Sequence, residues 1–249
     1  MMIRTLLLTL FTIAPAWAEN LTVAAASDLK FAMDEILDEF HLQNANQTVK
    51  VVYGSSGRFH AQIKHGAPYD LYFSADIAYP ERLEEAGLAA SPVYPYAVGR
   101  LVVWSSAEGE PLSLADLPRA DIKRIAIANP RHAPYGQRAQ EAMESAGIWD
   151  KVEERLVLGS NIAQTAQFVE TGNADAGIVA LSLVLSPSLA EVGRYSLVPG
   201  TLHSPLKQGF IITRRAADNE LAWRFADFIN SDQARAIMDR YGFELPENP

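Results

Sequence analysis

The sequence YGSSGRFHAQI, residues 53–63, places two serines between two glycines and next to an arginine and a histidine. Such a group could be a serine nucleophile, because hydrolases activate a hydroxyl with a neighbouring base. It could equally be a set of donors for an anion, since hydroxyls and free N–H groups at the start of a helix bind oxyanions. The two interpretations make different demands on the neighbouring residues.

The nucleophile interpretation fits the spacing poorly. A nucleophile elbow reads G-x-S-x-G, and residues 54–57 read GSSG. His60 lies four residues after Ser56 and could contact it on a helix, but a triad also needs a group that orients the histidine. Asp70 and Asp76 are available, with no pattern that favours either. An exported serine hydrolase is therefore kept only as the alternative to a binding protein.

A metal centre is also poorly supported. The five histidines, at positions 41, 60, 65, 132 and 203, form no pair with i, i+4 spacing, and the chain has no cysteine. We therefore expect no catalytic residue, no cofactor and no side chain bound directly to a metal ion.

Four turns share the chemistry of an anion site. They are Ser27-Asp28 in AAASDL, Ser55 to Gly57 in GSSGR, Tyr135-Gly136 in ANPRHAPYGQ, and Gly159 to Asn161 before Ile162. Each opens a helical pattern, where the first N–H groups have no partner within the helix. Any one of them is more simply an N-cap. Four such turns are a stronger signal, although composition alone does not show that they converge.

The elements that must position these turns alternate between strands and helices. Strands are predicted at 21–27, 48–53, 69–74, 99–104, 124–128, 154–158, 176–181 and 210–213, and helices at 28–44, 58–64, 80–86, 136–146, 162–170, 221–230 and 233–241. This alternation predicts an α/β fold with mostly parallel sheets. In such sheets a ligand lies beyond the carboxyl ends of the strands, where helices begin.

The alternation falls into two halves without a flexible linker, which favours two lobes around a ligand cleft. We expect residues 19–96 to form the first part of lobe 1, residues 97–204 to form lobe 2, and residues 205–249 to complete lobe 1. The lobes would rotate about crossovers near residues 94–97 and 204–205.

The N-terminal segment and the charge indicate where the protein acts. Residues 1–18 have a basic start, an apolar core and an A-x-A signal, which predicts a signal peptide cleaved after Ala18 and export to the periplasm. The formal charge of −9 argues against nucleic-acid partners. We expect a monomer that binds a small ligand.

The chain resembles the periplasmic molybdate-binding proteins of ABC transporters, which are type II periplasmic solute-binding proteins. The similarity covers essentially the whole mature sequence and is carried by AAASDL, GSSGRFHAQI, GAPYDLYFSAD, NPRHAPYGQRAQEAM, ADAGIVA and FINSDQARAIMDRYGFELP. It implies a two-lobed fold, an oxyanion held by neutral donors in the cleft, and delivery to a permease in the inner membrane. The ligand would be molybdate, and tungstate would also bind. The competing ligand is another tetrahedral oxyanion such as sulfate.

The resemblance also implies which residues hold the oxyanion. They are Ser27, the N–H of Asp28, Ser56, Tyr135 and Ile162. One position departs from the family, because many members have a tyrosine where this chain has Ala180. We expect the Tyr135 hydroxyl to replace that donor. Whether Ser55 also reaches the anion is left open.

Asp28 poses a physical problem in this scheme. A carboxylate beside a doubly charged oxyanion would be repelled strongly in a cleft of low dielectric constant. We expect the Asp28 side chain to cap its own helix and to turn away, so that only its N–H meets the ligand.

Overall fold

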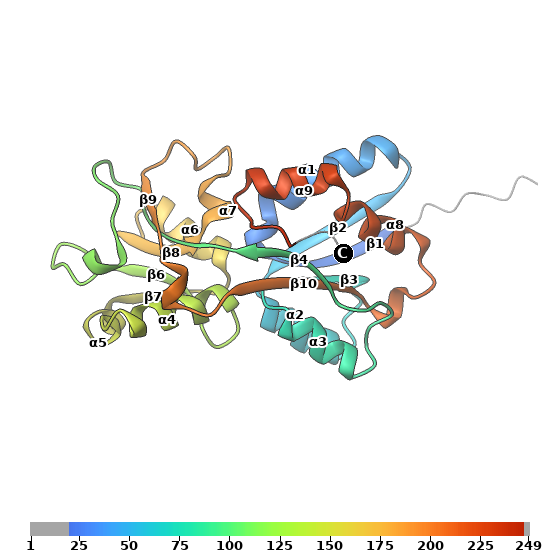
Figure 1. The fold of residues 1–249 in the computed structure, drawn as a ribbon, viewed down its shortest axis with the longest axis horizontal. Helices are drawn as coiled ribbons and strands as arrows, with labels where there is room; N and C mark the ends of the chain where they lie inside the picture. The colour runs from blue at the N-terminus through green and yellow to red at the C-terminus, as the bar shows by residue number, and fades with distance from the viewer. Residues whose placement is uncertain (1–19, 247–249) are drawn as a thin grey trace, which may run out of the picture.

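The computed structural model describes residues 20–246, and these form two α/β lobes side by side (Figure 1). The predicted signal peptide lies outside the described residues. Each lobe contains one five-stranded sheet with helices packed against it. This confirms the predicted two-lobed architecture.

The first sheet has the strand order β2-β1-β3-β10-β4. Its members are β1 (Asn20–Ala26), β2 (Thr48–Gly54), β3 (Leu71–Ser74), β4 (Tyr94–Gly99) and β10 (Leu206–Ile212). Strand β1 is parallel to its neighbours β2 and β3, whereas β10 is antiparallel to β3 and β4. The sheet is therefore mixed, with its parallel strands at one side.

The second sheet repeats this plan with the order β7-β6-β8-β5-β9. Its members are β5 (Leu101–Ser105), β6 (Ile125–Ala128), β7 (Leu156–Gly159), β8 (Ala176–Ala180) and β9 (Arg194–Leu197). Strand β6 is parallel to β7 and β8, and β5 is antiparallel to β8 and β9.

Helices cover both faces of the first sheet because successive strand residues point to opposite sides. Val23 and Ala25 of β1 pack in one cluster with α1 (Lys30–Gln43), α8 (Glu220–Ile229) and α9 (Asp232–Arg240). Ala24 points the other way and packs with α2 (Ser56–Lys64) and α3 (Ala78–Glu85). A 3₁₀ turn, η1 (Ser27–Leu29), joins β1 to α1.

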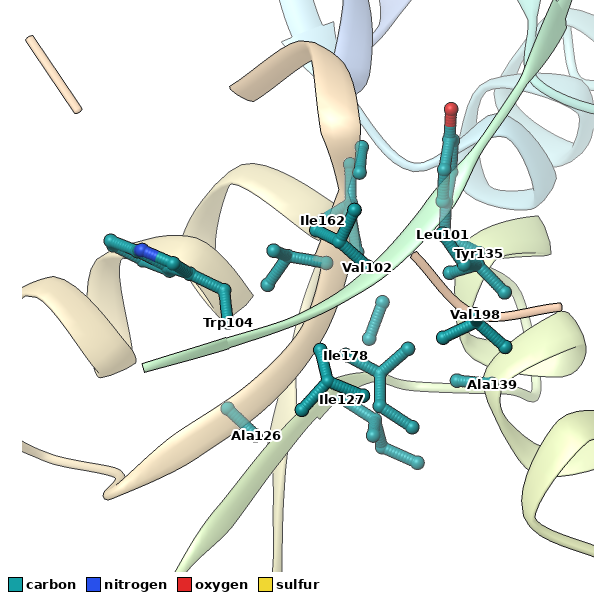
Figure 2. Packing of buried hydrophobic residues seen from close by; sticks show 14 of the residues in the cluster. Leu101, Val102, Trp104, Ala126, Ile127, Tyr135, Ala139, Ile162, Ile178 and Val198 are labelled. Atoms are coloured by element: carbon teal, nitrogen blue, oxygen red, sulfur yellow. The ribbon is translucent and has the colours of Figure 1, made fainter. Parts of the chain in front are cut away.

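The second lobe has a single large core. Its helices are α4 (Pro134–Ser145), α5 (Trp149–Val152), α6 (Ile162–Glu170) and α7 (Leu181–Val184). Short 3₁₀ turns complete the chain at η2 (Leu114–Asp116), η3 (Glu153–Arg155), η4 (Gly200–Leu202) and η5 (Arg214–Ala216). Figure 2 shows strands β5, β6 and β8 contributing Trp104, Ile127 and Ile178, and the Tyr135 ring rising from this cluster with its hydroxyl at the far end.

The two lobes are joined by short segments that lie side by side. Only Arg100 separates β4 from β5, and residues 198–205 connect β9 to β10. Gly99 and Leu206 pair across these segments, in the middle of the molecule in Figure 1. The boundary expected between residues 96 and 97 falls inside β4, because that strand continues to Gly99 in the first sheet.

Candidate functional site: a polar cavity between the lobes

The four predicted turns converge on one small cavity between the lobes. All five residues expected to hold an oxyanion line it, and the remaining lining residues are Ala26, Gly54, Ser55, Ala75, Ala133 and Pro134. The cavity volume is about 10 Å³, which is room for about one water molecule. A tetrahedral anion with four oxygens therefore needs the walls to move apart slightly.

Three helices have their N-termini at this cavity. Ser56 is the first residue of α2, Ile162 is the first residue of α6, and Tyr135 follows Pro134 at the start of α4. N–H groups in the first turn have no acceptor within the helix. The sequence sets these starts locally, since Asn161 caps α6 by accepting from Gln164 N at 2.9 Å and proline suits the first turn of α4.

Two serine hydroxyls in the cavity wall are held as donors. Ser56 Oγ accepts a hydrogen bond from Ala75 N at 3.0 Å, and Ser27 Oγ accepts one from Ala163 N at 3.2 Å. Both serines are buried. Because each oxygen already accepts an N–H, its own proton is left for an acceptor. The Ser27 bond also joins the lobes, since Ala163 belongs to α6.

Ser55 also lines the cavity, but its hydroxyl is engaged with the other lobe. Its hydroxyl donates to the backbone oxygen of His132 at 2.5 Å, and Oγ lies 2.9 Å from His132 Nδ1. Gly57 N donates to the same backbone oxygen at 2.9 Å. Ser55 and Gly57 therefore tie lobe 1 to the turn before α4 in lobe 2.

The Ser55–His132 contact lacks the features of a catalytic pair. The Ser55 proton is directed at a carbonyl oxygen, and within residues 20–246 the Nε2 atom of His132 has no partner to orient the ring. His60, considered beside Ser56, likewise has an unpartnered Nε2 and stacks near Tyr79 instead. The structure gives the hydrolase alternative no triad among the described residues.

The expectation for the Asp28 side chain is wrong in one respect. No side-chain capping bond is present at η1 or at the start of α1. The carboxylate instead accepts from Gln208 Nε2 at 2.8 Å, and its Oδ1 atom has no partner within the described part of the chain. Burial raises the pKa of Asp28 to about 6, and hydrogen bonds from Gln208, Tyr135 and the backbone N–H groups of Asp28 and Leu29 offset part of that rise. Tertiary packing has overridden the local capping preference.

The Tyr135 hydroxyl takes part in the same buried polar cluster. Gln208 Nε2 donates to Tyr135 Oη at 3.2 Å, and Gln208 Oε1 accepts from Tyr96 Oη at 2.6 Å. Burial, followed by the nearby Asp28 carboxylate, raises the pKa of Tyr135 well above its usual value. The hydroxyl expected to reach the anion is thus occupied by Gln208 and Asp28, whereas the N–H of Tyr135 stays at the helix start.

Gln208 is the functional neighbour that the sequence did not reveal. It is fully buried on β10 and links Tyr96, Asp28 and Tyr135, from three separate segments. The predicted strand began only at residue 210, so Gln208 was placed outside it. A buried amide in the apolar run LKQGFII was the available signal, because buried polar side chains are hydrogen-bonded.

The cavity holds donors but no cationic side chain, since none of its lining residues is Lys or Arg. The cation Arg138 pairs across the lobes with Asp76 at 3.4 Å and, within α4, with Glu141 at 2.6 Å. In the described range 20–246, no group of acidic, His or Cys side chains could hold a metal ion, and no helix is long and apolar enough to cross a membrane.

Comparison with known proteins places the chain in a family. The family of bacterial extracellular solute-binding proteins matches residues 21–244. The molybdate-binding protein ModA of Azotobacter vinelandii is 35% identical over 92% of both chains. The ModA protein of Rhodobacter capsulatus is 34% identical over 92% of this chain and 90% of its own.

A solved structure agrees with these sequence matches. The periplasmic molybdate-binding protein of Azotobacter vinelandii superposes with a TM-score of 0.86 and 31% identity, covering 91% of this chain and all of that one. The expectation of a binding protein rather than an enzyme is confirmed by this membership. With its two lobes, its interlobe cavity and these matches, the chain belongs to the bacterial extracellular solute-binding proteins.

Proposed function

We propose that this protein binds molybdate, and also tungstate, in the periplasm and delivers the bound anion to an ABC importer in the inner membrane. The observation that carries the proposal is the convergence of Ser27, Asp28, Ser56, Tyr135 and Ile162 on one cavity without a cation. The relatives named for molybdate, at 35% and 34% identity over nearly the whole chain, support the choice of ligand.

The donor chemistry suits a tetrahedral dianion. Molybdate accepts hydrogen bonds and donates none, so a buried molybdate needs N–H and O–H groups on every side. Each hydrogen bond to a charged group contributes about 1.5–3 kcal/mol. Five to seven such bonds, after the cost of closure, correspond to a Kd of about micromolar to nanomolar.

Size is the proposed basis of selectivity among oxyanions. Molybdate and tungstate have longer bonds to oxygen than sulfate has, and neutral donors do not distinguish these dianions by charge. Two of the donors have defined positions, because Ser27 Oγ and Ser56 Oγ each accept a hydrogen bond from a backbone N–H. A smaller anion would leave some of these hydrogen bonds stretched.

Closure of the lobes is the proposed signal to the permease. Ser55 and Gly57 contact His132, Arg138 pairs with Asp76, and Ser182 donates to the Asp28 carbonyl at 2.7 Å, all between the lobes. An anion that bridges both lobes favours closure of the lobes around it, since a ligand shifts a conformational equilibrium by its differential affinity.

A thermal-shift panel tests the proposal. Molybdate, tungstate, sulfate, phosphate and thiosulfate are each added to the purified mature protein, and the melting temperature is measured. A ligand that binds only the folded state must raise it. We expect large increases with molybdate and tungstate. A rise with sulfate alone would reassign the ligand, and no rise with any of them would refute oxyanion binding.

A further inference from the structure

Asp28 is an unusual wall residue for an anion cavity. Its side chain is only 1% exposed, and it lines the cavity together with Ser27 and Ser56. Oδ2 accepts from Gln208 Nε2, whereas Oδ1 has no partner among residues 20–246. A buried ionised carboxylate normally has several donors on both oxygens. One bare oxygen leaves a position that a proton can occupy.

The side chains that face Asp28 carry no positive charge that would compensate its carboxylate. Gln208 on β10 contributes a neutral amide, and Tyr135 on α4 and Tyr96 on β4 contribute phenols. Ser182 on α7 donates to the Asp28 carbonyl. Burial raises the pKa of both phenols well above 10, so neither titrates near neutrality.

The cation nearest in sequence is engaged elsewhere. Lys30, two residues further along, pairs with Asp34 at 3.0 Å, and its side chain is 43% exposed. Its ammonium group also lies over the rings of Phe31 and Tyr53. It faces the larger cleft of about 460 Å³ that adjoins the cavity at Ser27.

We infer that Asp28 takes up one proton from solvent when the oxyanion binds, so that the anion is held beside a neutral carboxyl group. The inference rests on the proposed function, because it requires a dianion in this cavity. A dianion in this cavity and an ionised Asp28 carboxylate in its wall repel each other. The charge repulsion is removed when the carboxylate binds a proton. The protonated carboxyl is also a hydrogen-bond donor, whereas the carboxylate is an acceptor only.

In the ligand-free protein, Asp28 already binds a proton more readily than an exposed aspartate does. Burial raises the pKa of Asp28 to about 6 without any anion present. A dianion beside it raises the pKa further, so at pH 7 to 8 the carboxyl is ionised in the free protein and protonated in the complex. By linkage, the Kd then increases up to tenfold for each unit of pH above about 6, and it becomes flat below that pH.

Calorimetric titration with molybdate tests the inference directly. The Kd is measured from about pH 6 to pH 8.5, and at about pH 8 in two buffers that differ in ionisation enthalpy, which gives the number of protons taken up. For the wild-type protein we expect about one proton at pH 8 and a Kd about 100-fold weaker at pH 8.5 than at pH 6.

Two variants separate this effect from general pH sensitivity. Asp28→Asn has nearly the same shape and cannot titrate, so we expect no proton uptake, a flat profile and tighter binding than wild type at pH 8.5. Asp38→Asn, an exposed position on the same helix, should keep the wild-type slope and the wild-type proton count.

The outcomes distinguish this inference from the proposed function. A wild-type protein that binds molybdate with no proton uptake overturns the inference and leaves the function intact, and this result needs no variant. An Asp28→Asn slope equal to that of wild type also overturns it. If no oxyanion binds even near pH 6, the proposed function itself fails.

Discussion

Replacing Asp28 with asparagine should stabilise the ligand-free fold by an amount that grows with pH. The folded protein raises the pKa of this carboxyl from 3.8 to about 6 through burial. Each pKa unit corresponds to about 1.36 kcal/mol, so complete ionisation of Asp28 costs the wild-type fold about 3 kcal/mol. Asparagine avoids that cost while filling almost the same space.

The sign follows from which state holds the proton. Well below pH 3.8 the carboxyl is protonated in both the folded and the unfolded protein, so ionisation contributes nothing. Between pH 3.8 and about 6 the unfolded chain loses its proton first, and wild-type stability falls as pH rises. Above about pH 6 the full cost is present and stays constant.

Urea unfolding in buffers free of oxyanions measures this difference. The free energy of unfolding is compared for wild type and Asp28→Asn near pH 4 and near pH 7.5. We expect the gap between the two proteins to grow by about 2.4 kcal/mol in favour of the variant at the higher pH, because a small part of the cost is already present at pH 4. A gap that stays constant between the two pH values would refute the argument that Asp28 is buried without charge compensation.

Two other substitutions test the walls of the cavity, and both are read by titration with molybdate. Ser56→Ala removes a hydroxyl whose oxygen accepts a hydrogen bond from Ala75 N. The loss of one hydrogen bond to a charged ligand should weaken molybdate binding about 10- to 100-fold. An unchanged Kd would exclude the Ser56 hydroxyl as a donor to the ligand. Gly57→Ala places a methyl group 2.7 Å from the backbone oxygen of His132 in the other lobe. This clash should hinder closure of the lobes and weaken molybdate binding, while the melting temperature of the ligand-free protein changes little. Wild-type affinity in Gly57→Ala would show that the Gly57–His132 contact is not needed in the bound state.

The sequence predicted those parts of the site that depend on local structure. The strands and helices flanking the four turns lie within a few residues of their predicted positions, because apolar periodicity and caps such as Asn161 act locally. Strands β4 and β9 were missed. Pro95 interrupts the strand pattern of β4, and Tyr195 and Leu197 of β9 are exposed at the sheet edge and give no apolar pattern.

What the sequence could not predict depends on contacts between distant segments. Asp28 was expected to cap its helix, which is the common local role of an aspartate before a helix. Its actual partner, Gln208, lies 180 positions further along the chain. Tyr135 lines one cavity with the other predicted residues, but its hydroxyl bonds to Gln208, which only the packing of β10 against α4 brings within reach.

The most direct test of the central claim is a calorimetric titration of the purified wild-type protein with molybdate near pH 6, beside the same titration with sulfate. The account predicts one molybdate per chain with a Kd between about micromolar and nanomolar, and much weaker binding of sulfate. Saturating molybdate that produces no binding heat and no change in melting temperature would contradict it.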